Sequence, residues 1–282
     1  MKLAIRCAQF SLALLLALLI TSFALLGKKD LPEEYIYQQY ANDTSRFIAT
    51  KTGNRFHYQI HGESDKPALL LLHGFMSSLY DYDEWIEELS SDFYIIRVDL
   101  PGMGLSAPNI TDDYSQRGLT EAIHDFVQAI SLENFSIAGH SRGGSVAWAY
   151  TVLYPNKVDK LILNAASGLT FEQNNDGNKP LSFRIAETPI VKEVLRYIAH
   201  PKSVKRSLNA LVYNQHHVSE RWVMRIYELS LHNNNRDRMV RMRPFIPDQS
   251  LIAKLPSIRQ PTLILWGEND ALTPISHGER YK

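Results

Sequence analysis

Apolar residues in the middle of the chain fall into short blocks of two alternating kinds. Continuous or period-two apolar runs are typical of β-strands, whereas apolar residues spaced three or four apart are typical of amphipathic helices. The strand-like runs are RFIAT (46–50), RFHYQI (55–60), ALLLLHG (68–74), FYIIRVDL (93–100), FSIAGH (135–140) and VDKLILNA (158–165). The helical runs are YDYDEWIEEL (80–89), LTEAIHDFVQAI (119–130) and SVAWAYTVLY (145–154). This alternation predicts an α/β fold with a mostly parallel sheet and helices on both faces.

The alternation stops after Gly168 and resumes at PTLILWG, residues 261–267. Between them, residues 170–248 show helical stripes and no convincing strand. A helical block inserted between two strands of a sheet predicts a cap over a site. We therefore expect a core in two parts, residues 46–169 and 249–282, with a helical cap between them. The stripes are Val191, Val194, Leu195 and Ile198, then Leu208, Leu211 and Val212, then Trp222, Ile226 and Leu229.

Residues 1–27 are set apart by an uncharged apolar run from Cys7 to Gly27. As a helix this run would be about 30 Å long, which matches one bilayer core. Two interpretations remain open, an uncleaved transmembrane anchor and a cleaved signal peptide. The run is longer than the apolar core of a typical signal peptide, about 7–15 residues, which favours the anchor. Either one predicts a protein body outside the cytoplasmic membrane, membrane-anchored or secreted. Residues 28–45 are polar and are predicted to be a linker.

Composition narrows the class of protein without identifying it. The 282 residues suffice for one large domain, and 30 basic residues balance 30 acidic ones, so no overall charge favours nucleic acid. Cys7 is the only cysteine, so no intramolecular disulfide can form. The predicted cap, residues 170–248, holds thirteen Lys or Arg and eight Asp or Glu. This excess of basic residues leaves two alternatives, a surface that only contacts solvent or a surface that binds anionic lipid. The candidate lipid contacts are Arg236, Arg238, Arg241 and Arg243.

The segment GHSRG, Gly139–Gly143, fits the G-x-S-x-G pattern of a nucleophile elbow. The pattern alone is weak, because glycine and serine are common in turns. Here a buried strand precedes it and a helix follows, which is the setting that an elbow requires. The turn would lift the Ser141 hydroxyl above the sheet, at a helix N-terminus that favours developing negative charge. We therefore predict that Ser141 is the nucleophile.

Two backbone amides are candidates for an oxyanion hole. Arg142 follows the nucleophile, and Phe75 lies in the HGF segment, on the loop after the strand-like run LLLLHG. His73, on the same loop, could be a catalytic base, but its place at the strand end favours a role in ordering the loop.

Two aspartates follow strands at positions where a functional carboxylate could lie. Asp99 begins DLPGMGLS, and a structural role in holding that turn is favoured over a catalytic one. Asp270 ends LWGEND after the last predicted strand, where a carboxylate could orient a histidine. Glu268 is the alternative in that segment, and Asp270 is favoured.

Together these segments resemble the α/β-hydrolase superfamily, in its branch of capped serine esterases, haloperoxidase-like enzymes and C–C bond hydrolases. The resemblance covers residues 46–282 and rests on HGF, DLPGMGLS, GHSRGG and PTLILWGEND in that order. It implies that Ser141 is acylated, that Asp270 orients a histidine, and that the amides of Phe75 and Arg142 hold the oxyanion. Serine at the elbow distinguishes the chain from dehalogenase and epoxide hydrolase relatives, which use aspartate there.

The base histidine has no match among the ten histidines of the sequence. The resemblance places it roughly 25–30 residues after Asp270, and the sequence ends at Lys282. We therefore expect the base to lie beyond residue 282 and the chain, as it stands, to be nearly inactive. His277, seven residues after Asp270, is expected in a helix that points away.

Two functions stay open from the sequence. The first is a serine hydrolase that acts on a small apolar ester, or a related acyl bond, with no cofactor and no metal. The second is a non-catalytic binding module, tethered to the membrane by its N-terminal helix. The sequence does not predict which ester is the substrate or whether the protein forms oligomers.

Overall fold

The computed structural model describes residue 21 and residues 27–169, 200–242, 247–270 and 272–282. The predicted N-terminal anchor and the first part of the predicted cap, residues 170–199, lie outside the described residues. Among the helices that the model does describe, none combines the length and the apolar character needed to cross a bilayer.

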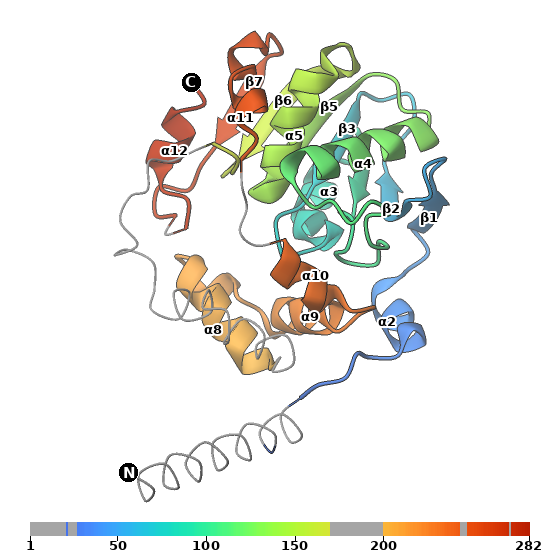
Figure 1. The fold of residues 1–282 in the computed structure, drawn as a ribbon. Helices are drawn as coiled ribbons and strands as arrows, with labels where there is room; N and C mark the ends of the chain where they lie inside the picture. Colours follow the sequence, from blue (N-terminus) through green and yellow to red (C-terminus); the bar gives the residue numbers. More distant parts are fainter. Residues whose placement is uncertain (1–20, 22–26, 170–199, 243–246, 271) are drawn as a thin grey trace, which may run out of the picture.

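A seven-stranded sheet forms the centre of the molecule, in the order β1-β2-β4-β3-β5-β6-β7 (Figure 1). The strands are β1 (Ser45–Ala49), β2 (Arg55–His61), β3 (Ala68–Leu72), β4 (Tyr94–Val98), β5 (Phe135–His140), β6 (Val158–Asn164) and β7 (Thr262–Leu265). β2 pairs antiparallel with both β1 and β4, and every other pairing is parallel. The prediction of a mostly parallel sheet is confirmed.

Helices lie between the strands along the chain and cover both faces of the sheet. They are α2 (Glu33–Tyr40), α3 (Asp83–Leu89), α4 (Gln116–Ala129), α5 (Arg142–Leu153), α8 (Pro201–Leu211), α9 (Glu220–Ser230), α10 (Asn235–Arg241), α11 (Gln249–Ile252) and α12 (Ile275–Glu279). Short 3₁₀ turns are η1 (Leu79–Tyr82), η2 (Pro155–Lys157), η4 (Gln215–His217) and η5 (Leu255–Ser257).

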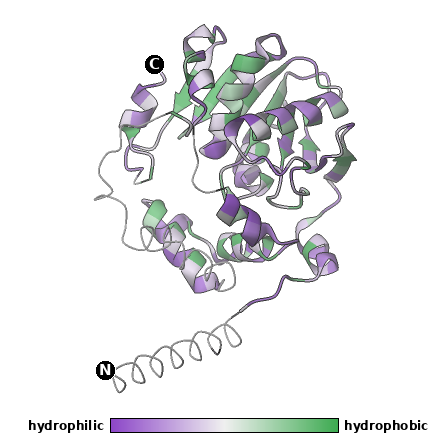
Figure 2. Cartoon of the chain, viewed as in Figure 1, coloured by the Kyte–Doolittle hydropathy of each residue, from purple (hydrophilic) through white to green (hydrophobic). Residues whose placement is uncertain are grey.

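Strand β3 shows how the two faces are filled. Leu70 and Leu72 pack into the main core with α4 and α5, whereas Leu69 and Leu71 pack on the opposite face against α3. Because successive side chains of a strand point to opposite faces, a strand buried on both sides is apolar throughout. Hydrophobic colouring is accordingly concentrated on the strands (Figure 2).

The described part of the cap, residues 200–242, contains α8, α9 and α10. It has a small core of its own, in which Leu208 of α8 packs with Val218 and Val223. The helices lie together on one side of the body that carries the sheet (Figure 1).

Three of the four arginines considered for lipid contact are engaged within the chain. Arg236 forms an ion pair with Asp30 at 2.7 Å, Arg241 forms one with Asp112 at 2.6 Å, and Arg238 is buried. Arg243 lies outside the described residues. These contacts attach the end of the cap to the rest of the molecule.

Part of the predicted linker is an ordered helix. α2 occupies residues 33–40, and its Ile36 is completely buried against Leu105 and Leu229. Leu229 belongs to α9 and Leu105 to the loop after β4, so α2 packs between the cap and the core. The polar composition of this segment predicted a linker. The residues that α2 packs against are distant in the sequence, so composition alone did not reveal these contacts.

Candidate functional site

Ser141 occupies the sharp turn between the end of β5 and the start of α5. Its backbone dihedrals are φ 51° and ψ −113°. Such a conformation is rare for residues other than glycine and costs on the order of 1–3 kcal/mol. The surrounding contacts must therefore enforce it, and strain of this kind is typical of functional sites.

The glycines of the motif permit the close packing of this turn. A Cβ on Gly139 would lie 2.2 Å from the carbonyl oxygen of Gly143. A Cβ on Gly143 would lie 2.0 Å from the carbonyl oxygen of Leu72, at the end of β3. Both distances are far below van der Waals contact, so the backbone requires glycine at each of these positions.

Backbone hydrogen bonds from β6 and the loop after it hold the turn. The Ser141 amide donates to the Asn164 carbonyl at 2.9 Å, and the Ser167 amide donates to the Ser141 carbonyl at 3.0 Å. The amide of Ser145, in the first turn of α5, also donates to the Ser141 carbonyl at 3.1 Å. Three separate segments thus fix the position of the candidate nucleophile at the carboxyl edge of the sheet.

The loop after β3 packs directly on this turn. A Cβ on Gly74 would lie 2.9 Å from His140 Nδ1 and 3.5 Å from Ser141 Cβ. The next residue, Phe75, has its ring under the Arg142 guanidinium, with 5.0 Å between Cζ and the ring centroid. The structure therefore brings both predicted oxyanion residues next to Ser141. Arg142 begins α5, so its amide points out of the helix N-terminus.

His73 orders this loop, as favoured from the sequence. The Leu100 amide donates to His73 Nε2 at 2.9 Å, so that nitrogen carries no proton. The proton is therefore on Nδ1, which donates to the Gly74 carbonyl at 2.8 Å. Both ring nitrogens are engaged, which joins the loop after β3 to the loop after β4.

Asp270 lies in the loop after β7, at the same edge of the sheet as Ser141. Its carboxylate accepts the amides of Leu272 and Thr273, at 2.9 and 2.8 Å, and the Thr273 hydroxyl at 2.7 Å. These bonds fix the carboxylate and leave it half-buried, whereas the alternative, Glu268, is exposed.

His140, the residue before Ser141, lies within electrostatic range of Asp270. Burial lowers the pKa of His140, and the carboxylates of Asp81 and Asp270 partly oppose that shift. Asp270 is therefore near the elbow, although its hydrogen-bonded partners are in its own loop.

No histidine in the described part of the chain is hydrogen-bonded to the Ser141 hydroxyl. His277 lies in α12, a helix as expected, and burial lowers its pKa. In the same described residues, no group of three His, Cys, Asp or Glu side chains is arranged to hold a metal ion.

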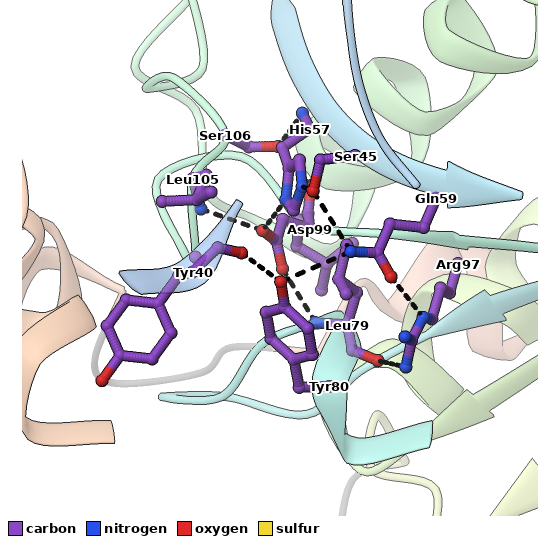
Figure 3. A network of polar contacts seen from close by, with 12 residues as sticks. Tyr40, Ser45, His57, Gln59, Leu79, Tyr80, Arg97, Asp99, Leu105 and Ser106 are labelled. Atoms are coloured by element: carbon purple, nitrogen blue, oxygen red, sulfur yellow. Dashed lines mark hydrogen bonds and ion pairs between the residues drawn. The ribbon is translucent and has the colours of Figure 1, made fainter. Parts of the chain in front are cut away.

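A hydrogen-bonded Ser–His–Asp chain occurs away from the elbow (Figure 3). His57 Nδ1 lies 2.7 Å from Asp99 Oδ2, and His57 Nε2 lies 2.9 Å from Ser45 Oγ. However, Ser45 Oγ also accepts the Asn42 amide at 3.1 Å and the Gln59 side-chain amide at 3.2 Å. With these partners the oxygen has no open direction for attack on a carbonyl carbon. The chain of bonds therefore joins β1, β2 and the turn after β4.

Asp99 lies at the centre of that network, which agrees with the structural role in holding the DLPGMGLS turn that the sequence favoured. Its carboxylate also accepts the amides of Leu79 at 2.8 Å and Leu105 at 2.9 Å. Burial alone would raise the pKa of Asp99, but the interactions with His57, His73 and the Leu105 amide together lower it below its ordinary value. The sequence did not single out Ser45 or His57, since only folding brings them to Asp99.

Comparison with known proteins agrees with this geometry. Residues 67–282 match the family model of the alpha/beta hydrolase fold. Epoxide hydrolase 3 of Xenopus tropicalis is 27% identical over 231 residues, which are 78% of this chain and 63% of that protein. Human monoacylglycerol lipase ABHD6 is 26% identical over 228 residues, 79% of this chain and 67% of that protein. The chain thus spans about two thirds of the length of these relatives.

Solved structures show the same fold. A hydrolase from Pseudomonas aeruginosa is 25% identical, with a TM-score of 0.65 over 84% of this chain and 85% of its own. The family model covers most of the chain, and the sheet, the elbow and the glycine contacts agree with it. The chain belongs to the α/β hydrolase fold family.

Proposed function

We propose that this protein is a serine hydrolase that cleaves an ester through an acyl-enzyme on Ser141. The observation that carries the proposal is the strained turn at Ser141, packed against the loop of Phe75. In a reaction of this type the hydroxyl oxygen attacks the ester carbonyl, and the amides of Phe75 and Arg142 stabilise the negative charge that develops. The alcohol then leaves with a proton, and water releases the acid from Ser141.

The proton must pass through a base, and we propose a histidine oriented by Asp270. The position of Asp270 after β7 supports this role, since its carboxylate lies at the same sheet edge as Ser141. Without the base, serine is a weak nucleophile. The sequence resemblance supports a histidine as the base.

The chemistry of serine favours an ester over an epoxide as substrate, although relatives named epoxide hydrolases are among those matched. A serine oxygen that opens an epoxide forms an ether, which water does not hydrolyse under mild conditions. A carboxylate that opens an epoxide forms an ester, which water can hydrolyse. Turnover of an epoxide therefore requires a carboxylate nucleophile, and this chain has Ser141 at that position.

Assays with two substrates test the choice of reaction. With a protein that carries the base histidine, we expect hydrolysis of p-nitrophenyl butyrate and no detectable hydrolysis of styrene oxide by the same preparation. Release of p-nitrophenol is followed by absorbance, and diol formation by chromatography. Diol formation without ester hydrolysis would contradict the proposal. Ligand binding without turnover of either substrate would favour the non-catalytic binding module.

An apolar, lipid-like ester is the substrate class that we propose. Phe75 is half-buried beside Arg142, and Arg142 in turn donates to the carbonyl of Met242, a buried cap residue, at 3.1 Å. Apolar side chains thus lie next to the elbow. The similarity to a monoacylglycerol lipase supports the same class.

We also propose that residues 1–27 attach the protein to a membrane, with the catalytic body outside the cytoplasm. Deletion of residues 1–27 should release the body from membranes, because this segment is the only apolar run of spanning length in the sequence. Sedimentation after an alkaline wash measures the effect, with the intact protein as control. A deletion variant that still sediments with the membranes would show that another surface binds them.

A further inference from the structure

The segment before the sheet, residues 30–41, makes a continuous set of contacts with the cap; we call it the arm. At its start, Asp30 forms an ion pair with Arg236 at 2.7 Å and accepts the Asn234 amide at 2.5 Å. The Leu31 amide donates to the Leu231 carbonyl at 2.9 Å. These bonds join the arm to the turn between α9 and α10.

Farther along the arm, two tyrosines converge on one carboxylate of the cap. Tyr35 donates to Glu228 Oε1 at 3.1 Å, and Tyr40 donates to Glu228 Oε2 at 2.8 Å. Between the two tyrosines, Ile36 is fully buried against Leu229, which follows Glu228 in α9. α2 therefore lies beside the C-terminal end of α9, as Figure 1 shows, and both polar and apolar contacts hold it there.

The arm also contacts the core at Tyr80, a residue of η1. The Tyr80 hydroxyl donates to the Tyr40 carbonyl and accepts the Gln59 side-chain amide at 3.3 Å (Figure 3). Two guanidinium groups lie near its ring, Arg97 at 5.4 Å and Arg225 at 5.2 Å from the centroid. Arg225 belongs to α9 and Arg97 to β4. Arm, cap and core thus meet at one side chain.

Asp83 completes this junction. Its two carboxylate oxygens bind Arg97 at 2.6 Å and Arg225 at 3.3 Å. Arg225 also donates to the Tyr80 carbonyl at 3.4 Å. A charged bridge thus holds the cap helix against η1 in addition to the ring contacts.

η1 follows the loop of Phe75 by only a few residues. Within that stretch, Ser77 donates to Asp81 of η1, and the Leu79 amide donates to Asp99. A shift of η1 would therefore shift the loop that carries the candidate oxyanion amide.

We propose that the arm is a strap that holds the cap in one position on the core, and that Tyr80 is the positioning residue through which strap and cap set the Phe75 loop. Tyr80 acts through its neighbours and does not touch the reacting atoms. Loss of the strap frees α9 to move, and loss of the Tyr80 hydroxyl loosens the loop.

Hydrogen–deuterium exchange of the full chain tests the strap without reference to catalysis. In the double variant Tyr35→Phe and Tyr40→Phe, both hydrogen bonds to Glu228 are lost while the rings remain. We expect the amides of α9 to exchange at least about fivefold faster, because hydrogen bonds to charged groups are the stronger class. Tyr213→Phe is the matched control, since this cap tyrosine is 79% exposed. Glu228→Gln is the milder second variant.

Tyr80→Phe tests the link to the loop. This variant keeps the ring beside both arginines and removes only the hydroxyl. We expect faster amide exchange in residues 74–78 and a slower reaction of Ser141 with a fluorophosphonate, by about fivefold, with the ester KM nearly unchanged. This kinetic part rests on the proposed function, whereas the exchange part does not. Exchange within twofold of wild type in α9 for both the tyrosine double variant and Glu228→Gln would overturn the strap, and unchanged exchange in residues 74–78 would overturn the role of Tyr80. If Ser141 does not react in a wild-type protein that carries the base histidine, the proposed function fails while the exchange results still decide the strap.

Discussion

Ser141→Ala, in a protein that carries the base histidine, is expected to lower ester hydrolysis by at least about a thousandfold, because the acyl-enzyme can no longer form. Removal of the hydroxyl should leave the fold unchanged. The strained turn is held by backbone bonds from Asn164, Ser145 and Ser167, and none of these uses the serine side chain. Initial rates with p-nitrophenyl butyrate, compared with wild type at equal concentration, measure the loss.

Ser145→Ala is the matched control for that variant. Ser145 lies one turn along α5, is fully buried, and its hydroxyl has no hydrogen-bond partner among the described residues. The same chemical change is thus made next to the site with little expected effect on activity. Equal losses in the two variants would contradict the assignment of Ser141 and point to a packing effect.

Asp99→Asn is expected to lower the free energy of unfolding by about 3–5 kcal/mol, the range for breaking a buried charged pair. The carboxylate accepts three N–H groups, those of His57, Leu79 and Leu105. Asparagine has one acceptor oxygen and an amide group that cannot accept, so at least one buried N–H loses its partner. Because whole domains are stable by about 5–15 kcal/mol, this loss is large.

Chemical denaturation measures the effect, with Asp159→Asn as control, because Asp159 lies on β6 and is exposed. The pH dependence gives a second readout. The pKa of Asp99 is lowered in the folded state, so its carboxylate contributes stability that is present above the ordinary pKa of about 4. That stability is lost as the pH falls through the folded-state pKa. The Asp99→Asn variant should therefore lose less stability on acidification than wild type, and an equal loss would contradict the role of this carboxylate.

The sheet could be predicted from the sequence because its signal is local. A strand buried on both faces, such as residues 68–72, must be apolar throughout, and the alternation with helices then gives the parallel arrangement. The turn at Ser141 could be predicted for the same reason. Only glycine fits at positions 139 and 143, and each of these glycines lies two residues from the serine.

The contacts of the arm could not be predicted, because their signal is not local. α2 carries few apolar residues, and Tyr35 and Tyr40 bind a carboxylate 193 and 188 residues away along the chain. Tyr80 has no distinctive motif, and its role depends on arginines from β4 and α9. Such residues become visible only when the fold brings three segments together.

The nucleophilic role of Ser141 is the central claim, and a covalent probe tests it most directly. The protein is treated with a fluorophosphonate and digested, and the modified peptide is identified by mass spectrometry. We predict one modification, on Ser141, that is absent in Ser141→Ala and retained in Ser145→Ala. Modification of another residue, or none on Ser141 in a protein that hydrolyses esters, would contradict the claim.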